Sequence, residues 1–325
     1  MKIANVILTF LAAVGIAYAE ASPKITAEFY ASEGNAEKQI ADVMKNKIGA
    51  AGFNVMKANV HIEKFYYEKY KEKGVEMISF YDVINMKAIR PLLLKNPDFG
   101  AYTPFNFLVY KTLDNKNDNY TWYGHLDADM MLDIIGCKDE ASREAFRKMV
   151  AGLDDVVKKE LKPVKTRIFP RSKPLPKVTL TKMVKKFDKP DDMEEFVEDF
   201  VMEHDGRFSK HDFIIAGFID LKFEYGDMDL DFDKYDAYWV SLLCHFKFSN
   251  SIFNRGKPEA GMFAPCSIYF YIPKGKNELH VGYSGVRNWI NGLDFKDQER
   301  IEYMQSIDAE VVETFKELGF ELIQK

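Results

Sequence analysis

Two stretches of the chain decide the fold: Asn-Pro-Asp-Phe-Gly-Ala-Tyr-Thr-Pro at 96–104 and Lys-Pro-Glu-Ala-Gly-Met-Phe-Ala-Pro at 257–265. Proline, glycine and proline recur in both at one offset, because 258 − 97, 261 − 100 and 265 − 104 all equal 161. The coinciding residues are Pro97, Gly100, Pro104, Pro258, Gly261 and Pro265. Proline and glycine each constrain the backbone in a particular way, so three coincidences at one offset indicate an internal repeat.

The elements around these stretches repeat as well. Each stretch precedes an alternating apolar strand, at 105–110 and 266–271, and each copy closes with an amphipathic helix, at 139–161 and 297–318. In the first copy, periodicity and turn residues further predict a strand at 25–31, a helix at 32–52 capped by Ser32, a strand at 53–62, a polar connection at 63–74, a strand at 75–83, a short helix at 85–94, and a hairpin of strands at 101–112 and 120–126. In the second copy they predict strands at 178–187, 212–223 and 237–244 and a helix at 191–205. The predicted fold class is α+β: two tandem copies of a β-α-β(4)-α two-layer domain, an antiparallel sheet covered by helices.

Composition and charge further divide the chain into a signal peptide, two domains and a linker. A single Lys2, an apolar stretch at 3–18 and Ala17-Tyr18-Ala19 are typical of a cleaved secretory signal peptide at 1–19. The stretch would span only about 24 Å, short of a ~30 Å hydrocarbon core, so we expect a periplasmic or secreted bacterial protein that is not an integral membrane protein. The predicted domains are 20–161 and 178–325, joined by a proline-rich basic linker at 162–177.

The overall composition is that of a folded globular protein. Its 325 residues are 47% hydrophobic, and 45 basic against 50 acidic residues give a net charge of −5. Disorder and a disulfide-dense miniprotein are excluded, and the charge does not favour nucleic acid as a partner.

The order strand, helix, four strands, helix, with a short helix before each proline-glycine stretch, resembles the bacterial domain-of-unknown-function family DUF302. The second copy carries the pattern better, with Cys244 ending one strand and Cys266 opening the next, whereas Val83 and Phe105 occupy these positions in the first copy. The resemblance implies a sheet that grips a long carboxy-terminal helix, similar to the TATA-binding-protein-like or helix-grip fold, and a tandem pair acting as an internal pseudo-dimer. It implies no activity, since the family has no established one.

Cys244, Cys266 and His245 are the strongest candidates for chemistry. Antiparallel strands would bring the two cysteines close enough for a disulfide if their Cα atoms come within about 7 Å. His245 offers a proton acceptor or a further metal ligand. Three interpretations stay open: small hydrophobes packed in a sheet, a disulfide, or a reactive or metal-bound thiol. Cys137 precedes a predicted helix start, where the helix dipole favours a thiolate.

A run of alternating aspartates is the other candidate site. The run Asp227, Asp229, Asp231 and Asp233 resembles the opening of a calcium loop. Phe232 and Tyr238 stand where such a loop needs glycine and glutamate, so we interpret the run as a strand or extended segment with one wet face. A loose surface cation site is the alternative. The sequence lacks the nucleotide, hydrolase, zinc-hydrolase and covalent haem motifs, and we predict no cofactor.

Aromatic residues are concentrated at 65–67, 102–107, 120–123 and 269–271. Such rings either line an apolar cavity or fill the core and the face between two domains. With no catalytic motif, the sequence favours a non-catalytic binding or accessory protein for a small apolar ligand or a protein partner, as a monomeric pseudo-dimer or a homo-oligomer. The alternative function is a thiol-dependent redox or metal-binding protein using Cys244, Cys266 and His245.

Overall fold

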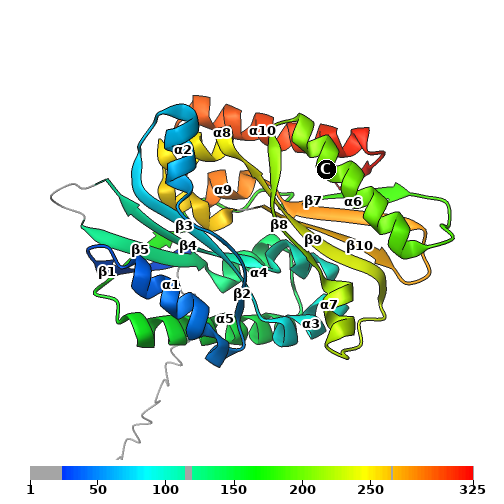
Figure 1. Cartoon of the computed structure of the whole chain (residues 1–325), viewed down its shortest axis with the longest axis horizontal. Coiled ribbons are helices and arrows are strands. Elements are labelled where there is room, and N and C mark those ends of the chain that lie inside the picture. Colours follow the sequence, from blue (N-terminus) through cyan, green and yellow to red (C-terminus); the bar gives the residue numbers. More distant parts are fainter. Residues whose placement is uncertain (1–23, 114–118, 265, 325) are drawn as a thin grey trace, which may run out of the picture.

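The computed structural model describes residues 24–113, 119–264 and 266–324. These residues form two halves, each an antiparallel six-stranded sheet with helices (Figure 1). The strand order is β2-β3-β4-β5-β1-β6 in the first half and β8-β9-β10-β11-β7-β12 in the second, so every strand has a counterpart in the other half. The predicted α+β class, with two similar halves, is confirmed.

The first half contains β1 (Ile25–Glu33), α1 (Glu37–Asn46), η1 (Ile48–Ala51), β2 (Asn54–Asn59), α2 (Ile62–Tyr70), β3 (Val75–Ile84), α3 (Met86–Lys95), η2 (Pro97–Tyr102), β4 (Phe105–Thr112), β5 (Tyr120–Leu126), α4 (Ala128–Ile134), α5 (Glu140–Leu161) and β6 (Lys165–Pro170). The second half contains β7 (Leu180–Lys186), α6 (Met193–Lys210), β8 (Phe213–Asp220), α7 (Leu221–Asp227), β9 (Tyr235–His245), α8 (Phe246–Ser249), η3 (Asn250–Asn254), η4 (Pro258–Phe263), β10 (Cys266–Pro273), β11 (Glu278–Ser284), α9 (Arg287–Gly292), α10 (Gln298–Glu317) and β12 (Glu321–Gln324).

The beginning of the first helix differs from the prediction. Strand β1 continues through Ser32 to Glu33, and α1 begins only at Glu37. Ser32 is therefore no helix cap: it pairs with Thr121 in the sheet, and its hydroxyl hydrogen-bonds with that of Tyr123 at 3.1 Å. The chain turns at Gly34, whose φ of 68° is a left-handed conformation that glycine adopts freely.

Helix α2 occupies most of the segment predicted to be a polar connection and begins at Ile62, because β2 ends at Asn59, earlier than predicted. It is bounded by His61 and Lys71, both in the left-handed region with φ of 57° and 59°. Charged and aromatic side chains are mixed along it, with Phe65 and Tyr67 exposed and Glu63 buried, so the sequence pattern alone did not reveal the helix. Tyr66 is fully buried, so packing against the rest of the molecule accounts for the helix.

The sixth strand of each sheet was not predicted. Strand β6 lies inside the proposed linker at 162–177 and pairs with β1, so the first sheet extends into that segment. Strand β12 follows Gly319, which has the left-handed φ of 85° expected after a helix end, and pairs with β7. Both strands are short edge strands, and the side chains of β6 are largely exposed, which explains the weak hydrophobic pattern.

The proline-glycine stretches lie where the two halves meet. A Cβ added to Gly100 would collide with Tyr238 Oη and lie 2.5 Å from Tyr269 Cβ of the second half. A Cβ added to Gly261 would lie 2.9 Å from Leu108 Cδ1 of the first half. The contact is reciprocal, since Tyr269 and Leu108 are themselves 161 residues apart.

Hydrogen bonds cross the same boundary. Tyr238 Oη donates to the carbonyl of Pro97 at 2.6 Å, and Ser267 Oγ donates to that of Pro104 at 3.0 Å. In the opposite direction, Asn106 Nδ2 of the first half donates to the carbonyl of Gly261 at 2.6 Å. The repeated residues therefore hold one half against the other. Pro258 opens η4 in the same region, and Pro265 lies outside the described residues.

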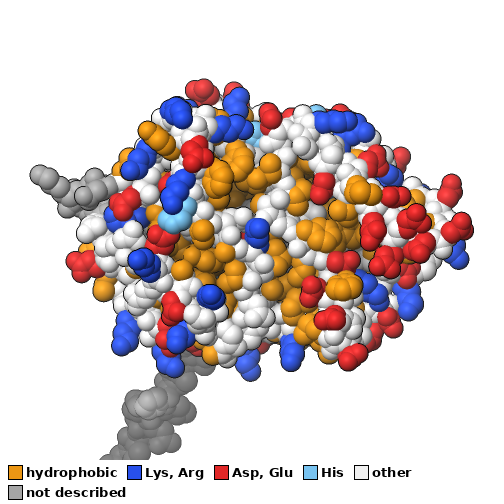
Figure 2. All heavy atoms as spheres, viewed as in Figure 1, with side chains coloured by type: hydrophobic (Ala, Val, Ile, Leu, Met, Phe, Trp, Pro, Cys, Tyr) orange, Lys and Arg blue, Asp and Glu red, His pale blue; other side chains and the backbone are white. Residues whose placement is uncertain are grey.

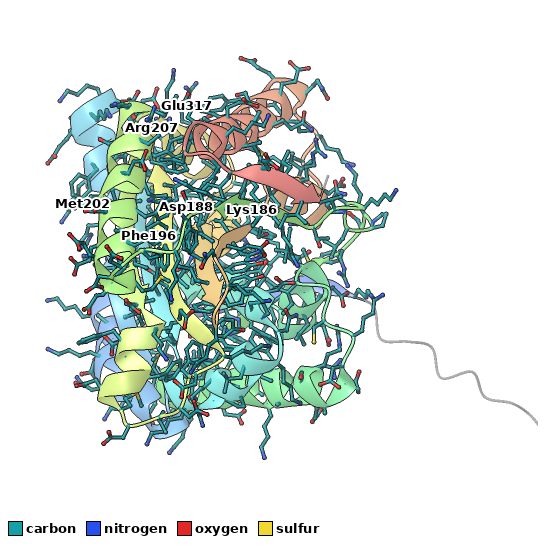
Figure 3. All side chains as sticks on the ribbon, turned by 90° about the vertical axis from the view of Figure 1, so that its right-hand side faces the viewer. Lys186, Asp188, Phe196, Met202, Arg207 and Glu317 are labelled. Atoms are coloured by element: carbon teal, nitrogen blue, oxygen red, sulfur yellow. The ribbon has the colours of Figure 1, made fainter. Side chains whose placement is uncertain are left out.

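Helices α6 and α10 lie side by side on the outside of the second half and are joined by an ion pair of Arg207 with Glu317 at 3.2 Å (Figure 3). Within the described ranges, no helix is long and apolar enough to cross a membrane. The predicted signal peptide at 1–19 lies outside these ranges.

Candidate functional site

The register of β9 and β10 places the two signature cysteines on opposite faces of their sheet. Cys266 lies opposite Leu243, and in an antiparallel pair opposite residues share a face. Cys244 is the next residue along β9, so its side chain leaves the sheet on the other side. Both are free thiols. In the first copy Phe105 lies opposite Val83, just as Cys266 lies opposite Leu243 in the second. Leu243 is therefore the counterpart of Val83, and Cys244 is the counterpart of Ile84. This register corrects the comparison of the two copies made from the sequence.

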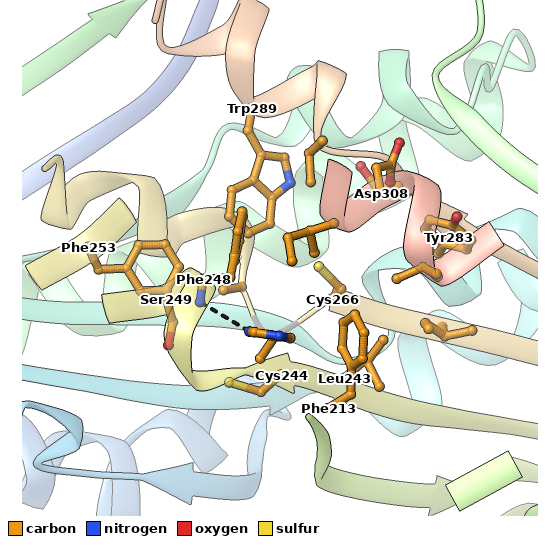
Figure 4. A pocket seen from close by; sticks show the side chains of 17 residues that line it. Phe213, Leu243, Cys244, Phe248, Ser249, Phe253, Cys266, Tyr283, Trp289 and Asp308 are labelled. Carbon is orange, nitrogen blue, oxygen red and sulfur yellow. Dashed lines mark hydrogen bonds between the residues drawn. The ribbon is translucent and has the colours of Figure 1, made fainter. Parts of the chain in front are cut away.

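Cys266 faces a small cavity beneath the last helices of the second half (Figure 4). Trp289 of α9 and Asp308 of α10 line this cavity together with apolar side chains. Cys244 and His245, at the end of β9, also reach its wall. Its volume of about 50 Å³ leaves room for a few water molecules at most. Burial raises the pKa of Cys266 to about 12, and the charges of Asp308 and Cys244 add to the effect. A buried, protonated thiol is a poor nucleophile and a poor metal ligand.

His245 has a structural role at the start of α8. Its Nδ1 accepts a hydrogen bond of 3.1 Å from the backbone N–H of Phe248, drawn as the dashed line in Figure 4. The ring packs against that of Phe213, with centroids 4.9 Å apart at 79°. Burial lowers the pKa of His245, in keeping with a neutral imidazole that accepts at Nδ1. Within the part of the chain that the structure describes, no three histidine, cysteine or acidic side chains form a group that could hold a metal ion.

Cys244 faces a larger groove between the two halves. The groove has a volume of about 350 Å³, within the range of about 300–1,000 Å³ typical of small-molecule sites. Apolar side chains from both halves predominate in its wall, and Figure 2 shows apolar atoms gathered on this face of the molecule. The lining residues are Lys57, Asn59, Ile62, Phe65, Tyr66 and Phe80 of the first half, and Ile214, Ile215, Ala216, Cys244, Phe246, Ser249, Phe253 and Ala264 of the second.

Aromatic side chains of α2 and α8 meet at the rim of the groove. The rings of Phe65 and Phe246 stack with centroids 5.9 Å apart and an angle of 24°. Phe65 is nevertheless 50% exposed, an unusual amount for so large an apolar side chain. Lys69 Nζ lies 5.9 Å from the centroid of the Phe246 ring, so a cation stands beside this apolar rim.

Polar groups of Tyr66, Cys244 and Ser249 also line the groove. The hydroxyl of Tyr66 is buried and makes no hydrogen bond of 3.5 Å or less with the described residues, although the Ser249 hydroxyl lies near enough to lower its pKa. Burial raises the pKa of Tyr66 well above its usual range, and Cys244 adds to this. Burial also raises the pKa of Cys244 to about 11, although the Ser249 hydroxyl opposes the shift. A buried hydroxyl without a hydrogen bond is costly, so this part of the groove suits a ligand atom or a water that hydrogen-bonds with it.

The aspartate run, interpreted as a strand or extended segment with one wet face, forms no strand. Helix α7 ends at Asp227, and the chain then turns through Asp229, whose φ of 53° is left-handed. Lys222 Nζ lies 3.1 Å from Asp233 Oδ1 and lowers the pKa of this carboxyl. The four aspartates are exposed whereas Phe232 is buried, so the run does have the one wet face that its alternation predicts. Strand β8 ends at Asp220, which caps α7, and so is shorter than predicted. Cys137 also differs from the expectation, since burial raises its pKa.

Sequence reasoning singled out Cys244 but did not identify the groove. The aromatic run at 65–67 could have pointed to the groove, because the sequence allowed such rings either to line an apolar cavity or to fill the core. Lys57, Ala216 and Phe246 gave no signal, since they come from three separate elements that only tertiary packing brings together.

No family model matches the chain, and no curated protein matches its sequence. Among solved structures, it is similar to a structure described as an uncharacterized conserved protein DUF302 from Bacillus stearothermophilus. That likeness has a TM-score of 0.32 and 19% identity, and covers 39% of this chain and 97% of the other. The family resemblance predicted from the sequence stays a prediction.

Proposed function

We propose that this protein is a non-catalytic binding module whose two halves act as an internal pseudo-dimer and hold a small apolar ligand in the groove between them. The observation that carries the proposal is the groove of about 350 Å³, lined mainly by apolar side chains and also by a few polar ones, among them Tyr66 and Ser249. An apolar site with a few polar groups that orient the ligand is the usual form of a small-molecule site. Export through the predicted signal peptide would place this activity in the periplasm or outside the cell.

The thiol-dependent alternative has less support. Burial raises the pKa of both signature thiols, and the strand register directs them to opposite faces of the sheet. His245 accepts a backbone hydrogen bond through Nδ1, so that atom is occupied by a structural contact. No observation in the described residues specifically favours redox or metal chemistry.

The test of the binding function uses the uncharged fluorescent probe N-phenylnaphthylamine. Its emission should rise on binding to the full chain, and Ala216→Trp should abolish the rise because the indole fills the groove. The matched control is Ala309→Trp, in a surface hollow of about 320 Å³ lined in part by α10, and this variant should bind the probe as the unaltered protein does. Equal binding by the two variants, or none by the unaltered protein, would contradict the proposal.

A further inference from the structure

The charge in the lining of the groove is positive. Among the residues that line it, Lys57 is the single charged side chain. Lys57 lies on the exposed edge strand β2 and makes no ion pair with any described residue. Lys69 adds a second positive charge at the rim, beside Phe246. The acidic residues Glu63 and Asp82 also lie close by, since their charges raise the pKa of Tyr66 and of Cys244, but they are buried and do not line the groove. A positive charge in an apolar wall attracts a ligand that carries a negative group.

Asp82 is the acidic residue closest in the sheet to Lys57. The two residues are direct cross-strand partners in β2 and β3. The carboxyl of Asp82 is 1% exposed, and it accepts a long hydrogen bond of 3.5 Å from the Asn59 amide. Burial raises the pKa of Asp82 well above its usual range, despite the opposing effects of Lys57 and Asn59. Because burial disfavours the charged form of Asp82, this carboxyl competes with a ligand for Lys57 less than a solvated carboxylate would.

The remaining lining matches an apolar chain or ring. Ile62 and Phe65 of α2 face Ile214 of β8 across the boundary between the halves. Ile214 is 39% exposed, so a ligand seated there would cover apolar surface that now meets water. The Tyr66 hydroxyl offers one further hydrogen bond.

We infer that the ligand of the groove is an anionic amphiphile, with an apolar chain between α2 and β8 and a carboxylate head paired with Lys57. The inference rests on the proposed binding function and adds the chemical class of the ligand. An ion pair at an exposed lysine contributes at most about 1 kcal/mol. The apolar chain therefore supplies most of the affinity, and the head group decides which of several ligands with the same chain binds best.

The test compares three probes with the same chain and different heads: octanoate, octanol and octylamine. Isothermal titration calorimetry with the full chain should rank octanoate first, binding about five-fold more tightly than octanol, and octylamine last. Lys57→Glu should reverse the order of octanoate and octylamine and leave octanol unchanged. Lys148→Glu makes the same charge change on the exposed face of α5, away from the groove, and should keep the original order.

The outcomes separate the two proposals. If octanol binds as tightly as octanoate and Lys57→Glu changes neither, the head-group inference is wrong although the groove still binds apolar molecules. If Lys148→Glu alters the preference as strongly as Lys57→Glu, the effect comes from net charge and the inference is also wrong. If none of the three probes binds the unaltered protein, the proposed function itself is wrong.

Discussion

Asp308 is a carboxyl group in surroundings that disfavour its charge. It lies on α10, lines the small cavity with Cys266, and approaches Tyr283. Burial raises its pKa to about 6, partly offset by the backbone N–H of Val286 and the charge of Arg287. In an unfolded chain the group would have the ordinary pKa of about 4. The folded protein therefore binds more protons than the unfolded chain between about pH 4 and pH 6.

The expected consequence is a loss of stability with rising pH. Because the folded pKa is the higher one, the contribution of Asp308 to folding becomes less favourable as pH rises from about 4 to about 6, and is constant above that. Asp308→Asn should raise the free energy of unfolding by about 1–2 kcal/mol at pH 7 and have little effect at pH 4. Urea unfolding at the two pH values measures the difference.

The control variant should change the free energy of unfolding in the opposite direction. Lys173 and Lys296 hold the pKa of Asp294 at about 2, so Asp294→Asn should lower stability at pH 7. If both variants change stability in the same direction at pH 7, the assignment for Asp308 is wrong.

At the scale of elements, a turn of the second half fixes the start of a strand in the first. Asn254, the last residue of the π-helical turn η3, accepts hydrogen bonds through Oδ1 from the backbone N–H groups of Gly74 and Val75, at 2.7 and 3.1 Å. Its Nδ2 donates to the Glu72 carbonyl at 3.3 Å. The side chain of Asn254 is buried, so these contacts are shielded from water.

Asn254→Ala should lower the free energy of unfolding by about 2–3 kcal/mol, because it leaves two backbone N–H groups near the boundary without their acceptor. Thermal or urea unfolding checks the value. Asn46→Ala, at the exposed end of α1 where Asn46 bonds only with Asp42, is the control and should change stability by less than about 0.5 kcal/mol. A small effect of Asn254→Ala, similar to that of the control, would show that η3 does not stabilise β3.

At the scale of the whole molecule, the halves are joined because the backbone of η2 and that of η4 each pack closely against the sheet of the other half. Gly100 allows η2 to approach Tyr238 and Tyr269, and Gly261 allows η4 to approach Leu108. Tyr269 Oη also donates to Asp98 at 2.6 Å. The groove exists because this contact sets β2 and β8, the edge strands of the two sheets, beside each other.

Gly100→Ala should destabilise the protein by about 1–3 kcal/mol, since the added methyl group has no space between the halves. It should also weaken binding of N-phenylnaphthylamine, because the displaced halves change the groove. Gly206→Ala lies in helix α6 with open space at the Cβ position and should stabilise the protein by about 0.5–1 kcal/mol. A neutral Gly100→Ala would contradict the role given to the repeated glycines.

The sequence by itself determined the class of fold and its duplication. Proline and glycine repeated at an offset of 161 are local backbone constraints, readable without a structure, and apolar periodicity predicted the long helices α5 and α10. Periodicity did not predict β6, β12 or α2, whose side chains are largely polar or exposed, because these elements depend on neighbours distant in the chain.

Only the tertiary structure decided where chemistry can occur. The sequence placed Cys244 and Cys266 near each other but could not say which face each occupies, since a shift of one residue in strand register reverses the direction of a side chain. The groove likewise depends on Lys57, Tyr66 and Ala216 from separate elements, and their meeting follows from the packing of two sheets. Local patterns thus specified the two copies, and the contact between the copies created the candidate site.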